Sequence, residues 1–145
     1  MTSNGFTQGQ IVDRIKQTVG PKGWIESTDS MASYLSDWRQ RFHGKATLVV
    51  RPDSTAQTAK VVRLCAESKI PIVPQGGNTS LCGGATPDPS GKAVVISLSR
   101  MNRIRSIDVA NHTITVEAGC ILKQVQDAAA QAGRLFPLSL SAEGS

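Results

Sequence analysis

The sequence is poor in the residues on which disulfide, metal and membrane functions depend. It has three cysteines that stand far apart, which fits neither a disulfide framework nor the ligand spacing of a zinc site. We therefore expect Cys65, Cys82 and Cys120 to be free thiols, buried or half-buried, in a reducing compartment. No stretch approaches the roughly 18 consecutive apolar residues of a membrane-spanning helix, and the first ten residues lack the basic start and apolar core of a signal peptide. The sequence predicts a cytoplasmic protein without a transmembrane segment.

Bases that titrate near neutral pH are scarce as well. His43 and His112 are the only histidines, and no cluster of His, Asp or Glu has metal-ligand spacing. His112 falls in a predicted turn, where we expect an exposed side chain with a structural role. We predict no catalytic residue and no metal-binding residue in this chain.

Aromatic residues make up only 4% of the 145 residues, so the core must consist mainly of Val, Ile, Leu and Ala. A hydrophobic content of 39% with 19% charged residues is typical of one folded domain. The formal net charge of +5 favours an anionic ligand. The densest basic group is Arg100, Arg103 and Arg105, and no aromatic residue interleaves with it, so we expect no nucleic-acid partner. We expect this group on a solvated face, or on a surface covered by a further part of the protein.

Glycine, in contrast, is concentrated in one place. Four glycines lie within nine positions, at 76–77 and 83–84, after the apolar stretch 70–73 and before the apolar stretch 93–98. Glycines are costly to order, and without a Cβ their N–H groups can form a nest for an anion. Asn78, Thr79 and Ser80 could add side-chain donors for a phosphate or pyrophosphate. A plain structural turn is the alternative, because the loop is neither a P-loop nor the Gly-x-Gly-x-x-Gly of a Rossmann turn.

The periodicity predicts an α+β fold, with a mixed parallel and antiparallel sheet flanked by helices. We expect helices over 8–19, from a Ser54 cap with Gln57 in a capping box to about 66, and over 121–132, with a short helical segment at 27–36. We expect strands over 46–50, 70–73 and 93–98, and a hairpin of 104–109 with 113–117. The expected buried face of the second helix is Thr58, Val61, Val62, Cys65 and Ala66.

Several motifs in fixed order resemble the FAD-linked oxidases, the family that includes vanillyl-alcohol oxidase, D-lactate dehydrogenases and glycolate oxidase. The likeness lies in residues 51–55 with the following helix, in 72–79, in 116–119 with Leu122, and in 136–145. Asp37-Trp38-Arg39, with Phe42 and Gly44, is most similar to the D-2-hydroxyglutarate dehydrogenase branch. The resemblance implies the amino-terminal part of a PCMH-type FAD-binding domain over 37–145, truncated at its carboxyl end, after an N-terminal helical segment at 1–36.

The resemblance also implies which residues hold the cofactor. The glycine loop would embrace the FAD pyrophosphate, and residues near 137–145 would lie along the flavin or its ribityl chain. The implied contacts are Pro74, Gln75, Gly76, Gly77, Asn78, Thr79, Ser80, Gly83, Gly84, Ala85, Pro137, Leu140, Ala142, Gly144 and Ser145. Members that bond FAD covalently through this loop carry histidine where this chain has Asn78, so the FAD here would be non-covalent. Ser141 departs from the family, which usually has glycine there.

By this resemblance the chain is the FAD-binding part of an oxidoreductase that oxidises a 2-hydroxy acid, with the catalytic histidine and metal ligands in a later segment. One alternative is a flavoenzyme like the enolpyruvyl-glucosamine reductases, against which stretch 136–140 and the region of Trp38 argue. A second is a non-catalytic nucleotide-binding or assembly module completed by another chain. We expect Trp38 to pack in the core rather than to cover the adenine, and Glu117 to end a strand or contact a ribose or backbone group.

Overall fold

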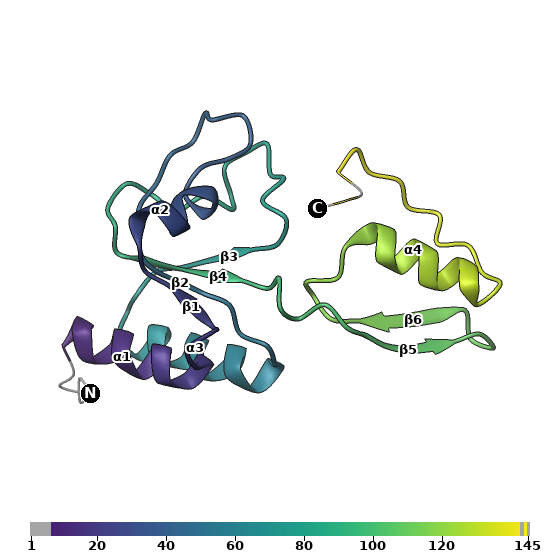
Figure 1. Cartoon of the computed structure of the whole chain (residues 1–145), viewed down its shortest axis with the longest axis horizontal. Helices are drawn as coiled ribbons and strands as arrows, with labels where there is room; N and C mark the ends of the chain where they lie inside the picture. Colours follow the sequence, from purple (N-terminus) through teal and green to yellow (C-terminus); the bar gives the residue numbers. More distant parts are fainter. Residues whose placement is uncertain (1–6, 143, 145) are drawn as a thin grey trace.

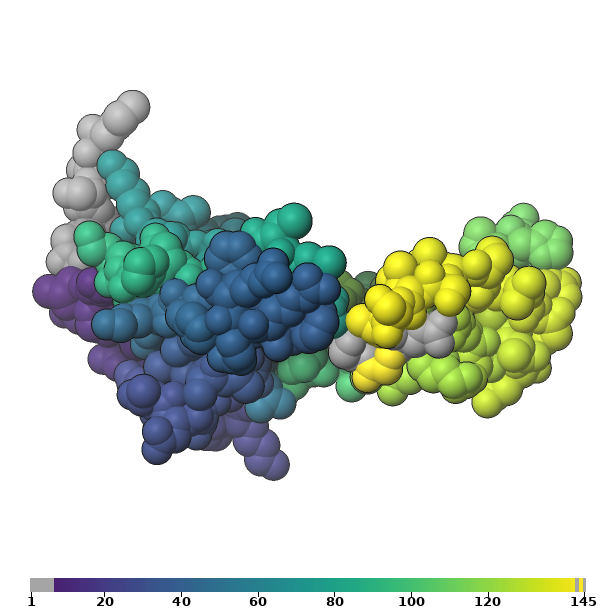
Figure 2. Space-filling view, turned by 90° about the horizontal axis from the view of Figure 1, so that it is seen from above, coloured from purple at the N-terminus to yellow at the C-terminus, as the bar shows by residue number. Residues whose placement is uncertain are grey.

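In the computed structural model, which describes residues 7–142 and 144, two lobes are joined by a narrower waist (Figures 1 and 2). The first lobe contains a four-stranded sheet in the order β1-β2-β4-β3. Its strands are β1 (Trp24–Ile25), β2 (Ala46–Val50), β3 (Ile72–Gln75) and β4 (Ala93–Ser97). Strands β2, β4 and β3 are parallel and β1 is antiparallel to β2, so the sheet is mixed, as predicted.

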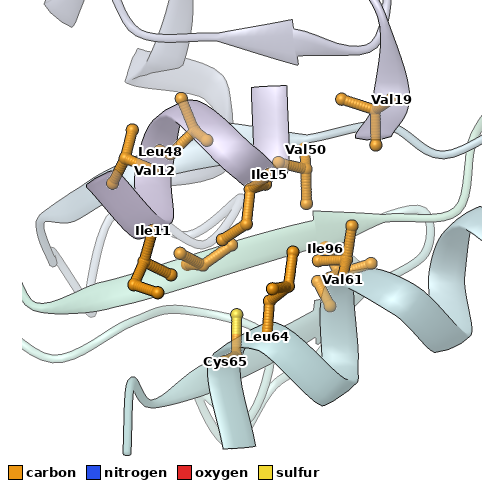
Figure 3. Packing of buried hydrophobic residues seen from close by; sticks show 11 residues of the cluster. Ile11, Val12, Ile15, Val19, Leu48, Val50, Val61, Leu64, Cys65 and Ile96 are labelled. Carbon is orange, nitrogen blue, oxygen red and sulfur yellow. The ribbon is translucent and has the colours of Figure 1, made fainter. Parts of the chain in front are cut away.

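The main core lies between this sheet and two helices, α1 (Gln8–Val19) and α3 (Thr55–Glu67), on one face (Figures 1 and 3). Ile15, Leu48 and Val61, from α1, β2 and α3, are fully buried in it. Every residue of β4 is buried, as a central parallel strand requires. The opposite face carries α2 (Thr28–Met31) and the short 3₁₀ helix η1 (Ala32–Tyr34).

The second lobe is a hairpin of β5 (Ile104–Asp108) and β6 (Thr113–Val116) with helix α4 (Leu122–Gln131) against it (Figure 1). The predicted hairpin is confirmed, with His112 at its turn in the left-handed region, φ 53°. Gly133 ends α4 with a φ of 67°, which glycine adopts without strain. No helix in the described part of the chain is long and apolar enough to cross a membrane.

The elements depart from the prediction in three places. Strand β3 lies two residues later than expected, because Pro71 precedes the paired segment and only its carbonyl is bonded, by Val94 N–H. The buried face of α3 is Val61, Leu64 and Cys65, whereas Val62 and Ala66 are exposed. Ser54 does cap α3, but the Gln57 side chain accepts from Asp53 N–H, so the capping box is incomplete.

Two predictions of burial were wrong. Trp38 is 60% exposed, because the neighbouring Asp37 side chain occupies the interior of the turn instead. Cys82 is exposed on the glycine loop, although Cys65 is buried and Cys120 is half-buried, as expected. Burial raises the pKa of the Cys65 thiol to about 11, which keeps it protonated.

Candidate functional site

The glycine loop begins where β3 ends, at the carboxyl edge of the parallel strands. Gln75 pairs with Ser97 of β4, and its carbonyl accepts from Leu98 N–H at 3.0 Å. Beyond this last pair the chain leaves the sheet and runs through Gly76 to Ala85. In open α/β sheets, ligands bind at this edge because the strand-to-helix or strand-to-loop connections converge there.

The loop glycines serve different purposes. A Cβ built at Gly76 or at Gly84 meets no atom within 4 Å, so the bare backbone there faces open space. Gly83 has a φ of 73°, and a Cβ on it would lie 2.9 Å from the Phe42 ring. Gly83 is therefore required by the fold, whereas Gly76 and Gly84 are free of any such steric demand from the chain.

A second loop faces the first across a cavity of about 180 Å³. This loop, residues 118–121, follows β6, and Gly119 N–H donates to the Met101 carbonyl at 2.8 Å. A Cβ at Gly119 would overlap the Leu98 carbonyl, so the two backbones meet there only because residue 119 is glycine. The cavity is lined by Gly76, Gly77, Ser99, Asn102, Ala118, Gly119, Cys120 and Ile121.

The second loop is fixed by a buried carboxylate. Glu117 is 3% exposed, and its Oε2 accepts from Arg103 N–H at 3.0 Å and from Arg103 Nε at 3.3 Å. Its Oε1 accepts from Nη2 of Arg103 at 3.0 Å and of Arg105 at 3.4 Å. The hydrogen bonds from Arg103 lower the pKa of Glu117 to about 2. Glu117 thus does more than end a strand. It directly precedes the cavity-lining loop, and its carboxylate bonds that end of the loop to Arg103, the residue before β5.

The basic group 100–105 is therefore paired and is not a bare solvated face. Arg103 and Arg105 bind Glu117 while their side chains stay 71% and 50% exposed. Arg100 donates to the Arg51 carbonyl at 2.9 Å and to Asp53 at 3.1 Å. These arginines give the waist between the lobes its polar contacts.

The predicted loop residues divide into exposed backbone and internal support. Pro74, Thr79, Gly76, Gly77 and Gly84 are exposed. Asn78 does not direct its amide into the cavity, because Nδ2 donates to the carbonyls of Ser36 at 2.7 Å and Ser33 at 3.3 Å. Its Oδ1 is buried and has no hydrogen-bond partner among the described residues.

The predicted residues near the carboxyl end lie on the segment after α4, which runs back along that helix towards the first lobe (Figure 1). Gln126 Nε2 holds this segment through the Leu138 carbonyl at 2.8 Å. Pro137, Leu140 and Gly144 are exposed, Ala142 is half-buried, and Ser145 lies outside the described residues. None of the four described residues is among those that line the 180 Å³ cavity.

Six cavity residues were not among the predicted contacts: Ser99, Asn102, Ala118, Gly119, Cys120 and Ile121. The motif at 116–119 pointed to this second loop, but only the folded hairpin shows that it lies opposite the glycines.

The two histidines do not line this cavity. His43 is exposed beside the Gln40 carbonyl, and His112 Nδ1 accepts from Arg134 Nε at 3.1 Å. Among the described residues, no group of three or more His, Cys, Asp or Glu could hold a metal ion.

FAD fits these features better than a compact apolar ligand would. Bare backbone at Gly76 and Gly84 admits bulky phosphate oxygens, and the hydroxyl of Ser99 and the amide of Asn102 can hydrogen-bond. Fold and site together are those of a domain in which a strand-end glycine loop and a second loop border one cavity.

Comparison with known proteins identifies the family. Residues 46–145 match the family of the FAD binding domain, so the chain belongs to this family and its cofactor is FAD. The chain is 35% identical over 134 residues to the "Probable D-2-hydroxyglutarate dehydrogenase, mitochondrial" of Oryza sativa subsp. indica, covering 92% of this chain and 24% of that protein. It is 30% identical over 127 residues to the glycolate oxidase subunit GlcD of Bacillus subtilis, covering 88% and 27%. The chain thus spans about a quarter of the length of these relatives.

Solved structures confirm the fold. Alkyldihydroxyacetonephosphate synthase superposes with a TM-score of 0.85 at 18% identity, over 100% of this chain and 29% of that chain. p-Cresol methylhydroxylase superposes with a TM-score of 0.71 at 24% identity, over 95% and 28%. The predicted α+β, PCMH-type architecture is therefore correct.

Proposed function

We propose that the glycine loop and the second loop hold the pyrophosphate of FAD, and that the protein containing this chain oxidises a 2-hydroxy acid. The observation that carries the first part is the open backbone at Gly76, which lines a cavity that Gly119 of the second loop also lines. The substrate class rests on the relatives, which are named for D-2-hydroxyglutarate and glycolate.

In this proposal the residues of the chain bind and orient the cofactor. Backbone N–H groups of 76–80 and 83–85 would donate to the phosphate oxygens, and the hydroxyls of Thr79 and Ser80 would add further donors. Pro137, Leu140, Ala142, Gly144 and Ser145 would lie along the ribityl chain and flavin, and the FAD would be bound non-covalently, because the amide of Asn78 cannot form the histidine–flavin bond. When bound, FAD supplies the hydride acceptor, and the base that takes the hydroxyl proton comes from outside these residues.

A substitution at Gly76 tests the cradle. Gly76→Ala adds one methyl group into open space without the strain of a left-handed φ, so the fold accepts it. If phosphate lies against this backbone, the methyl displaces it, and we expect the dissociation constant for FAD to rise at least tenfold at an unchanged Tm. Titration with FAD, followed by flavin fluorescence, measures the change. Gly9→Ala, at an exposed position of helix α1, is the matched control. An unchanged FAD affinity of Gly76→Ala would refute the proposal that the phosphate lies against this backbone.

The substrate class needs a separate experiment. We expect residues 1–145 with added FAD and an artificial electron acceptor to oxidise none of D-2-hydroxyglutarate, D-lactate, D-malate and glycolate. The protein from the complete reading frame should reduce the acceptor with at least one of them, and far more slowly with the L-enantiomers of the three chiral acids. Turnover by the short chain that His43→Ala removes would place the chemistry inside these residues. FAD binding without turnover by the complete protein would favour the assembly module.

The cytoplasmic location expected from the sequence stays a prediction. The Oryza relative bears the word mitochondrial in its name, so fractionation of the source cells must decide the compartment.

A further inference from the structure

A turn built on a buried carboxylate lies directly behind the glycine loop. Asp37 is 2% exposed, and its Oδ1 accepts from the N–H groups of Arg41 at 2.7 Å and Phe42 at 2.8 Å. Its Oδ2 accepts from Arg39 N–H at 3.2 Å. Three charge-assisted bonds from one side chain fix the backbone of residues 37–42 without help from a helix or strand.

The residues around this turn hold the glycine loop at three points. Gln75, 3% exposed, donates its two amide hydrogens to the carbonyls of Tyr34 at 3.0 Å and Ala85 at 2.8 Å, so it joins the two ends of the loop. Asn78 donates to the carbonyls of Ser36 and Ser33, which anchors the middle of the loop. The Phe42 ring packs on Gly83 at the third point.

These contacts oppose the intrinsic freedom of the loop. Glycine-rich backbone loses more conformational entropy on ordering than any other, and a ligand that orders it loses affinity accordingly. Asn78 also has a φ of 53°, a left-handed conformation that its amide contacts stabilise. When the loop is already ordered by these contacts, ligand binding does not have to order it, and less conformational entropy is lost on binding.

We propose that residues 33–42 form a supporting segment that pre-organises the glycine loop for FAD, with Gln75 and Asn78 as positioning residues. This inference rests on the proposed function, because it assigns the loop to FAD. It assigns a role to a segment that lies outside the family match at residues 46–145. It also implies that the hydrogen bonds of Asn78 and Gln75 within the chain increase the affinity for FAD.

Two variants remove the contacts while keeping the backbone. Gln75→Met retains side-chain length and burial but has no N–H group, and Asn78→Gly keeps the left-handed φ without strain. Lys69→Gly is the matched control, because exposed Lys69 has a φ of 54° and is remote from the loop in the fold. Gln75→Met and Asn78→Gly each lose two hydrogen bonds of ordinary strength, so we expect the FAD affinity of both variants to fall about tenfold. The FAD affinity of Lys69→Gly should stay unchanged.

Hydrogen exchange of residues 76–86 separates positioning from a general loss of structure. Without FAD, we expect amides of this loop to exchange at least about tenfold faster in both variants, while those of β2 and β4 keep their wild-type rates. Saturating FAD should restore the wild-type protection of the loop. Unchanged loop exchange would overturn the supporting segment, and faster exchange with unchanged FAD affinity would overturn its role in binding. If the wild-type chain binds no FAD, the proposed function fails, and faster loop exchange in the variants still supports the mechanical part.

Discussion

At the scale of single residues, Glu117 is the side chain on which the second loop most depends. Its carboxylate is almost completely buried and accepts four hydrogen bonds from two arginines. Removing the charge from such a site leaves the donors unsatisfied, so we expect Glu117→Gln to lower the Tm by several degrees and to weaken FAD binding. Glu67→Gln, at an exposed position on α3, should change neither. Equal Tm values for the two variants would contradict the role of Glu117.

The pH dependence of this effect has a definite sign. The pKa of Glu117 is about 2 in the folded chain against an ordinary value of 4.5. Its contribution to stability is therefore complete above the ordinary pKa and disappears as the pH falls from there towards 2. The Tm difference between wild type and Glu117→Gln should be largest near neutral pH and shrink as the pH is lowered through this range. Thermal scans of both proteins at several pH values measure it.

At the scale of elements, local signals in the sequence are sufficient for most helices and strands. Helix α1 has the bounds predicted from its apolar face and from Gly20-Pro21 after it, and the hairpin follows from alternation around residues 110–112. The glycine loop could also be placed, because it lies between two apolar stretches. Strand β2 also has its predicted bounds, whereas β3, which follows Pro71, is shifted by two residues.

Side-chain partners across the fold were beyond sequence reasoning for a physical reason. Gln75 meets the carbonyl of Tyr34, 41 residues away, and Glu117 meets Arg103, 14 residues away. Such pairs depend on how the elements pack, and a polar residue beside a glycine loop is equally compatible with a ligand contact. The residues of the loop thus suggested the Asn78 amide as a donor to the ligand, whereas in the structure it donates to the carbonyls of the chain itself, as the Gln75 amide also does.

At the scale of the whole molecule, the two lobes differ in how much apolar surface they bury. In the first lobe, eleven buried residues form one cluster between the sheet, α1 and α3. Within the described residues after 103, Val125 and Ala129 are the only buried hydrophobic side chains, and no residue of β5 is buried. Since burial of apolar surface is the main stabilising contribution, the second lobe should open at a lower free energy than the first.

Two spectroscopic probes can separate the lobes, because both tryptophans, Trp24 and Trp38, lie in the first. On heating without FAD, we expect the far-ultraviolet circular dichroism of β5, β6 and α4 to decrease before the tryptophan fluorescence changes. At the proposed site, FAD would contact the glycine loop of one lobe and residues 118–121 of the other, and would therefore couple the two lobes. At a concentration about 100 times its dissociation constant it adds about 2.7 kcal/mol to the stability of the bound form, so the two transitions should move up in temperature and coincide. Coincident transitions already present without FAD would contradict the independent opening of the second lobe, and FAD that shifts only the fluorescence transition would contradict a site that spans both.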